Sequence, residues 1–154
     1  AGVDPALAPL PVGKAQIRRE AKRRTHRVAI LAFGSVVPHA VAAGETLDAT
    51  VVNMRFVKPL DVALLAELAR THDAFVTVEE NVVMGGAGSG VAEALAELGL
   101  VVPMLHLGLP DRFLDHGDPA QIFADCGLDA RGIAAAVEAR FPARRDDAAA
   151  KPAA

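Results

Sequence analysis

The stretch from Glu79 to Gly90, Glu-Glu-Asn-Val-Val-Met-Gly-Gly-Ala-Gly-Ser-Gly, holds the residues of this chain whose types and spacing are best suited to binding or chemistry. Two adjacent carboxylates leave an apolar run, and a glycine-rich loop then leads into a helical pattern. Glycine lets a backbone adopt positive φ angles and approach a partner closely, because it has no Cβ. The segment therefore predicts a contact or ligand surface, with a tight strand-to-helix turn that binds nothing as the alternative.

Most catalytic patterns can be tested against this loop and set aside. Its glycines follow the third predicted parallel strand, whereas a dinucleotide fingerprint needs Gly-x-Gly-x-x-Gly after the first strand. Ser89 lacks the outer glycines of a nucleophile elbow. Glu79 and Glu80 are neighbours on a strand, so they face opposite sides and do not form an acid–base pair. We expect one to face the sheet's carboxyl edge and the other to support the loop.

The cysteine and the histidines give no stronger signal. Cys126, the single cysteine, is predicted to be a small buried hydrophobe at a helix end, and it fits a reducing compartment. The five histidines lack metal-ligand spacing, and His106, on an apolar strand, is expected to be a core or rim residue. We therefore predict no catalytic, cofactor-binding or metal-binding residue in this chain.

The elements that position the loop alternate between strands and helices. Apolar runs predict parallel strands, and a hairpin of 15–19 with 27–33 is expected to add one antiparallel edge strand. The pattern predicts an α/β fold, a three-layer α/β/α sandwich around a mostly parallel five-stranded sheet. Further strands are expected at 49–54, 74–79 and 102–107, and helices at 35–43 (closed by Gly44), 62–71 (capped by Asp61), 91–98, 119–127 and 129–141.

The same pattern divides the chain into a linker at 1–13, a domain at 14–141 and a weakly specified tail at 142–154. Central-strand side chains should form the core, with two leucines of the 62–71 helix packed on them. The residues predicted to be buried are Ile30, Leu31, Val52, Val76 and Val78, together with Leu65 and Leu68.

Composition excludes several classes of protein. The chain has 154 residues, is 52% hydrophobic and has a mean hydropathy of +0.29, as expected of a folded domain. No apolar run is long enough for a membrane span and no signal peptide is evident, so we expect a cytoplasmic protein without a membrane partner. The net charge of −3 argues against nucleic acid. A basic cluster over residues 18–27 is predicted to be a solvated hairpin turn and not a phosphate patch.

Three loops leave the predicted strands at the carboxyl edge of the sheet, where partners of open α/β sheets usually bind. They are rich in glycine, proline and charge, and we expect them to dock another domain. Amides near Ser89 at the helix start are expected to receive an anionic group from outside. The docking candidates are Arg55, Lys58 and Asp61 in the first loop, Glu79, Glu80, Asn81, Gly85, Gly86, Gly88 and Ser89 in the second, and Asp111 and Arg112 in the third.

Three separated motifs carry a family resemblance. Asn53–Asp61 (Asn-Met-Arg-Phe-Val-Lys-Pro-Leu-Asp), the glycine loop and Leu107–Phe113 (Leu-Gly-Leu-Pro-Asp-Arg-Phe) occur in this order. With 11–14 and 125–129 they make residues 10–141 resemble the C-terminal domain of the 1-deoxy-D-xylulose-5-phosphate synthases, in the transketolase superfamily.

The resemblance implies a fragment of a larger enzyme. Full-length synthases of this kind condense pyruvate with glyceraldehyde 3-phosphate in isoprenoid biosynthesis, and two N-terminal domains hold thiamine diphosphate and Mg²⁺. The Gly-Asp-Gly…Asn signature for that cofactor is absent here, since Pro119 follows Gly117-Asp118. The resemblance thus implies an inactive fragment that docks on the N-terminal domains of a homodimeric transferase. The C-terminal domain of a transketolase or of a 2-oxo-acid dehydrogenase beta subunit, and a free-standing anion-binding regulatory domain, remain alternatives.

Overall fold

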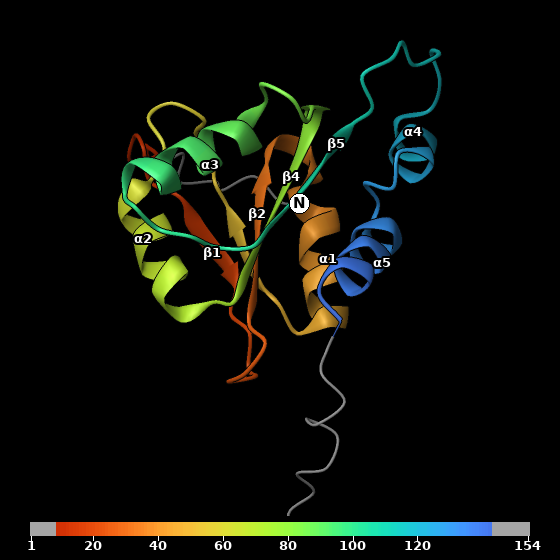
Figure 1. Cartoon of the computed structure of the whole chain (residues 1–154). Coiled ribbons are helices and arrows are strands. Elements are labelled where there is room, and N and C mark those ends of the chain that lie inside the picture. The colour runs from red at the N-terminus through yellow and green to blue at the C-terminus, as the bar shows by residue number, and fades with distance from the viewer. Residues whose placement is uncertain (1–8, 143–154) are drawn as a thin grey trace, which may run out of the picture.

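A five-stranded sheet lies between two layers of helices in the computed structural model, which describes residues 9–142 (Figure 1). This is the predicted three-layer α/β/α sandwich. Residues 143–154 of the predicted tail and residues 1–8 of the predicted linker lie outside the described residues, so these two boundaries stay predictions. None of the helices among the described residues is long and apolar enough to cross a membrane.

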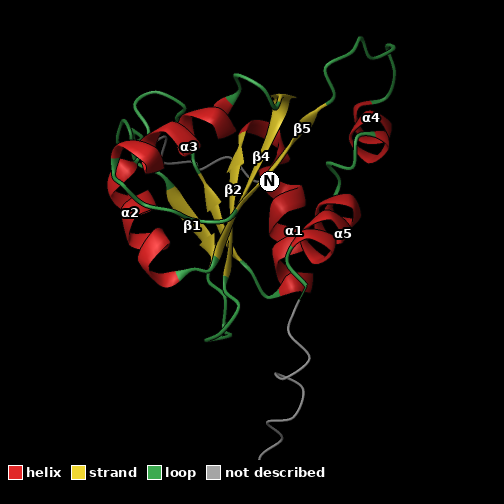
Figure 2. Cartoon of the chain, viewed as in Figure 1, coloured by secondary structure: helices red, strands yellow, loops and turns green. Residues whose placement is uncertain are grey.

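Strands and helices alternate along the described part of the chain, except that it begins with two successive strands and ends with two successive helices (Figure 2). The strands are β1 (Gln16–Arg19), β2 (Val28–Phe33), β3 (Thr50–Asn53), β4 (Ala74–Val82) and β5 (Met104–Leu109). The helices are the 3₁₀ turn η1 (Gly34–Val36), α1 (Val37–Leu47), α2 (Val62–Thr71), α3 (Ala87–Glu97), α4 (Pro119–Asp125) and α5 (Ala130–Arg140).

The sheet has the strand order β1-β3-β2-β4-β5. Strand β2 pairs in parallel with β3 on one side and β4 on the other, and β4 pairs in parallel with β5. Strand β1 is the antiparallel edge strand that was expected, but it pairs with β3. The predicted hairpin of 15–19 with 27–33 is wrong, because β3 and β4 occupy both edges of β2.

Each face of the sheet carries its own apolar core. Ile30, Val76 and Val78 point toward α1 and α5, where Ile133 and Val137 cover them. On the other face, Leu31, Val52 and Phe75 pack against α2 and α3. The seven residues predicted to be buried are all in these cores. Figure 1 shows α1 and α5 on one side of the sheet and α2 and α3 on the other.

Helix α1 does not end at Gly44, as the sequence analysis expected. Gly44 lies inside the helix, and a Cβ at this position would meet the Val51 side chain, so the glycine lets α1 pack closely on β3. The helix instead ends before Asp48, which has a φ of 50°. The predicted ends of 74–79, 91–98 and 102–107 were also displaced, by a few residues each, from the observed β4, α3 and β5.

Asp48 also changes the interpretation of the basic cluster. Its carboxylate accepts hydrogen bonds from the amides of Lys22 and Arg23 and forms an ion pair of 2.7 Å with Arg19. The Arg19 guanidinium and these amides hold the pKa of Asp48 well below its usual range. Arg19 at the end of β1 and Arg23 in the segment that follows it therefore anchor this part of the chain to the end of α1, and the prediction of a merely solvated turn is wrong for these two residues.

Candidate functional site

The loop between β4 and α3 is built around the carboxylate of Glu79. This side chain is only 3% exposed, and its two oxygens accept the amides of Ala87 at 2.7 Å and Gly88 at 2.9 Å. A carboxylate at this place also faces the positive end of the α3 dipole. The expectation that these amides receive an anionic group from outside is therefore wrong, since the chain's own carboxylate binds them.

The glycines of the loop make room for this internal arrangement. A Cβ on Gly86 would overlap the Glu79 carboxylate and the Val82 carbonyl oxygen, and a Cβ on Gly88 would overlap the side chains of Thr77 and His106. Gly85 has a φ of +76° and closes the turn. The glycine pattern that suggested close approach by a partner is thus explained first by close approach within the chain.

Glu80 points to the opposite side of the strand, as predicted from the alternation of side chains. Its carboxylate accepts the backbone amide and the hydroxyl of Ser35, which follows β2. Gly34 leaves space for this contact, because a Cβ there would meet Glu80 Oε1. Glu79 therefore supports the loop and Glu80 joins it to the neighbouring strand exit, while remaining exposed.

The loop after β3 is held in a similar way by a buried carboxylate. Asp61, 7% exposed, accepts the amides of Leu64 and Ala15 and pairs with Lys14 at 3.3 Å. Burial raises the pKa of Asp61, but the hydrogen bonds from Ala15, Leu64 and Lys14 outweigh it and the pKa lies below its ordinary value. Asp61 thus caps α2, as predicted, and its carboxylate is turned inward. Of the docking candidates in this loop, Lys58 is exposed.

Arg55 stands out in the same loop because its φ is +59°, a region that side chains other than glycine seldom occupy. Its amide donates to the Asn53 side chain, and its guanidinium donates to Gln16 Oε1 at 2.8 Å. These contacts hold the guanidinium at the edge of a shallow hollow of about 400 Å³ between the first and second loops. The hollow is lined by Phe33, Gly34, Arg55, Val57, Glu79, Glu80, Asn81, Gly85, Gly86 and Ala87.

The remaining candidates divide between internal and exposed positions. The Ser89 hydroxyl donates to the Val83 carbonyl and accepts the Gly85 amide, so it closes the loop. Asn81, Asp111 and Arg112 are exposed. Within residues 9–142, neither Asp111 nor Arg112 takes part in an ion pair.

Sequence reasoning missed the apolar residues of this surface. Each of the three carboxyl-edge loops exposes one large apolar side chain: Val57 is 56% exposed, Met84 is 89% exposed and Phe113 is fully exposed. The sequence did offer one signal for these residues: each is an apolar residue inside a stretch of glycine, proline and charged residues. Exposed apolar anchors surrounded by polar residues are typical of protein–protein contacts. We call Val57, Met84 and Phe113 the apolar anchors.

Comparison with known proteins identifies the family of this chain. Residues 13–133 match the family described as transketolase, C-terminal domain. The chain belongs to the transketolase C-terminal domain family.

Its curated relatives in this family are much longer. The chain is 64% identical over 140 residues to a 1-deoxy-D-xylulose-5-phosphate synthase of Ralstonia pickettii, a match that covers 90% of the chain and 22% of the relative. It is 59% identical over 157 residues to the synthase of the same name from Thioalkalivibrio sulfidiphilus, covering 99% of the chain and 24% of that relative. The chain therefore spans less than a quarter of these relatives and corresponds to their C-terminal domain.

A solved structure shows the same family fold. The chain superposes with a TM-score of 0.78 on a split gene transketolase, described as an inactive beta4 tetramer. The two chains are 33% identical, and the match covers 94% of this chain and 47% of that one.

Within residues 9–142 of this transketolase C-terminal domain, no three His, Cys, Asp or Glu side chains are grouped to hold a metal ion. The α3 N-terminus, an obvious place for a phosphate, is filled by Glu79. His106 hydrogen-bonds Thr77 at 2.7 Å, and Cys126 is half-buried against the α1–α5 core.

Proposed function

We propose that this chain is the C-terminal domain of a 1-deoxy-D-xylulose-5-phosphate synthase. The observation that supports this best is the 64% identity to the Ralstonia pickettii synthase along 90% of the chain. In the whole enzyme, upstream domains would hold thiamine diphosphate and Mg²⁺ and would condense pyruvate, with loss of CO₂, with glyceraldehyde 3-phosphate. The enzyme would be a cytoplasmic homodimeric transferase, and this chain alone would be inactive.

The domain's own role, on this proposal, is to dock on the upstream domains through the carboxyl-edge loops. The three apolar anchors supply the apolar part of such a contact, and Arg55, Lys58, Glu80, Asn81, Asp111 and Arg112 supply a polar rim. Glu79, Asp61 and Ser89 act inside the domain and keep the loops in shape. Docking is therefore assigned to the exposed residues together with the half-buried Arg55, and loop shape to Glu79, Asp61 and Ser89, whose side chains bind within the domain.

A domain exchange tests the proposal. The C-terminal domain of the Ralstonia pickettii synthase is replaced by this chain, and product formation is measured beside the same synthase truncated before that domain. We expect the exchanged enzyme to be active and the truncated one to be inactive. In calorimetry the isolated chain should not bind thiamine diphosphate with Mg²⁺. An exchanged enzyme that is dimeric and loaded with cofactor but inactive would contradict the proposal, as would one-to-one cofactor binding by the isolated chain.

A further inference from the structure

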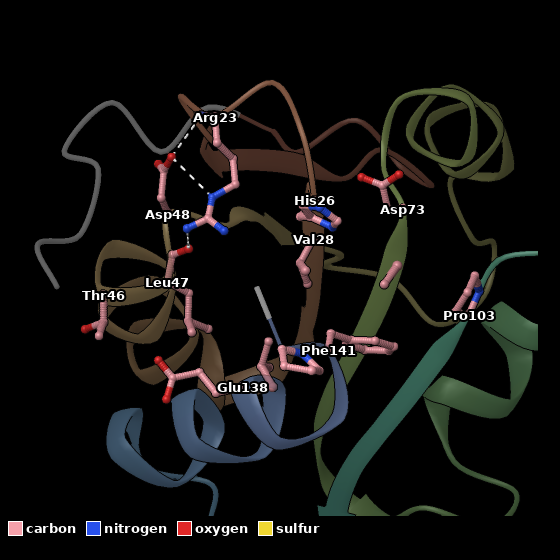
Figure 3. Close-up of a pocket in the computed structure, with 13 residues that line it drawn as sticks. Arg23, His26, Val28, Thr46, Leu47, Asp48, Asp73, Pro103, Glu138 and Phe141 are labelled. Atoms are coloured by element: carbon pink, nitrogen blue, oxygen red, sulfur yellow. Dashed lines mark hydrogen bonds and ion pairs between the residues drawn. The ribbon is translucent and has the colours of Figure 1, made fainter. Parts of the chain in front are cut away.

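A cavity of about 450 Å³ opens at the amino ends of the strands, at the opposite end of the sheet from the docking loops (Figure 3). Val28 begins β2, Ala74 begins β4 and Pro103 precedes β5, and the ends of α1 and α5 complete the wall. This volume is in the range of pockets that bind small molecules. No step of the proposed function uses this cavity.

The floor of the cavity is apolar. It is lined by Val28 and Ala74 from the sheet, Leu47 from α1, Val137 from α5 and Phe141, which follows α5. Figure 3 shows Val28 and Phe141 in the middle of the cavity, with Asp73 and Glu138 on opposite sides of it. A ligand with an apolar body would cover this floor and remove it from water.

Charged and titratable groups of both signs surround the cavity: Arg23, His26, Asp48, Asp73 and Glu138 line it, and the Arg140 guanidinium lies 5.1 Å from the centroid of the Phe141 ring. Arg23 pairs with Asp48 at 3.6 Å and donates to the Leu47 carbonyl, so this guanidinium and this carboxylate neutralise each other. Asp73 and Glu138 take part in no ion pair of the described part of the chain. One oxygen of Asp73 accepts the Arg27 amide. Two exposed carboxylates without an ion pair in the described part of the chain therefore stand at the rim of a largely apolar floor.

We propose that this cavity binds a small organic cation, in which an ammonium group is joined to an apolar body. The apolar body lies on Val28, Val137 and Phe141, and the ammonium group interacts with Asp73 or Glu138 at the rim. Opposite charge beside an apolar floor selects for such a ligand over an anion of the same size and shape.

Benzylammonium is a suitable probe, with benzoate and benzyl alcohol as probes that share the ring but differ in charge. Each is titrated into the ¹⁵N-labelled chain, and backbone amide shifts are followed by NMR. We expect benzylammonium to shift the amides around Val28, Ala74 and Phe141 and to saturate with a dissociation constant of about 1 mM or tighter, as is reasonable for so small a ligand. Benzyl alcohol should bind about tenfold more weakly, and benzoate should not saturate.

The double variant Asp73→Asn, Glu138→Gln tests the carboxylates. Asparagine can still accept the Arg27 amide, so the fold should be kept. Its affinity for benzylammonium should fall about tenfold. The matched control, Glu97→Gln with Asp115→Asn, removes the same charge at exposed positions outside the cavity and should bind as the unmodified chain does. Equal binding by both double variants, equal binding of benzoate, or shifts confined to other regions would overturn the proposal.

Discussion

At the scale of single residues, Glu79 organises the loop that drew attention in the sequence. The alternation rule correctly placed Glu79 and Glu80 on opposite faces. It could not say which of them binds the helix amides, because that depends on where β4 ends and α3 begins. The helix begins at Ala87, inside the glycine run, since Glu79 satisfies the amides that the first turn leaves unpaired.

Two glycines of α3 give a direct test of this arrangement. Gly88→Ala should destabilise the chain by about 1–3 kcal/mol, because its Cβ overlaps Thr77 and His106. Gly90→Ala is the matched control in the same helix, and nothing lies within 4 Å of a Cβ there. It should stabilise the chain by about 0.5–1 kcal/mol. Urea unfolding measures both, and equal effects would contradict the packing described for Gly88.

The carboxylate itself is tested by Glu79→Gln. The amide side chain keeps one acceptor but turns an NH₂ group toward the amides of Ala87 and Gly88, which leaves a buried donor unpaired. We expect a loss of about 1–3 kcal/mol in the free energy of unfolding. Glu97→Gln, at an exposed position of α3, should change the free energy of unfolding by less than about 0.5 kcal/mol. If the two substitutions cost the same, Glu79 would not be a structural anchor of the loop.

At the scale of elements, hydrophobic patterning was sufficient to identify every strand and every α-helix of the described residues, and the central-strand core with them. Their ends were harder, and Gly44 shows why. A glycine near the end of a helical pattern signals a cap, but the same residue also permits close packing, and only the position of Val51 on β3 decides between the two. The partner of β1 was missed for a related reason, since chain order does not reveal that β3 lies between β1 and β2.

Truncating an apolar side chain should lower the free energy of unfolding much more in the core than at the surface. Ile30→Ala removes a fully buried side chain of the central strand and should cost about 2–5 kcal/mol. Val101→Ala, at a position 97% exposed before β5, should cost less than about 0.5 kcal/mol. Urea midpoints compare the two variants, and an unchanged midpoint for Ile30→Ala would contradict the position of β2.

The contact between α2 and β3 should make stability depend on pH. Burial, and then the charge of Arg27, lower the pKa of His72 below the ordinary value of 6.5. Its ring lies against Thr50, with Nε2 2.8 Å from the hydroxyl. The folded state therefore favours the neutral ring. The stability that neutral His72 contributes is fully present above the pKa of this histidine in the unfolded chain. It is lost as the pH falls through that value toward the lower pKa of the folded chain.

The measurement is the free energy of unfolding at about pH 7.5 and about pH 5.5, on either side of the pKa of an unfolded histidine. The decrease in the free energy of unfolding from the higher to the lower pH should be smaller in His72→Gln than in the unmodified chain. His116→Gln, at an exposed position, should keep the full fall. The same fall in all three proteins would exclude His72 as its source.

At the scale of the whole molecule, the docking proposal predicts that stability and activity respond differently to the same substitution. Met84→Ser and Phe113→Ser replace side chains that the isolated domain does not bury, so its unfolding should change by less than about 0.5 kcal/mol. In the domain-exchanged synthase, the pair should lower activity or dimerisation by about tenfold or more. Val101→Ser, equally exposed but at the amino end of β5, should leave both unchanged. Loss of activity in Val101→Ser alone would place the contact elsewhere.

The large-scale features were the least accessible to sequence reasoning. The docking edge was predicted because strand polarity brings three loops together, but its apolar anchors are single residues in polar stretches and carry no periodicity. The amino-end cavity was not predicted, since its lining comes from segments as distant as Arg23 and Phe141. Such a site exists only through the sheet order and through the packing of α5 on α1.

The direction of β1 has one more consequence. Because β1 runs against β3, Gln16 lies beside Asn53, and Lys14 and Ala15 bind Asp61 in the loop after β3. The polypeptide therefore enters the domain at the edge that carries the apolar anchors. Any domain joined ahead of this point is tethered beside the surface it would contact. A short tether gives an effective concentration on the order of millimolar, so even a weak contact between the two would be largely occupied.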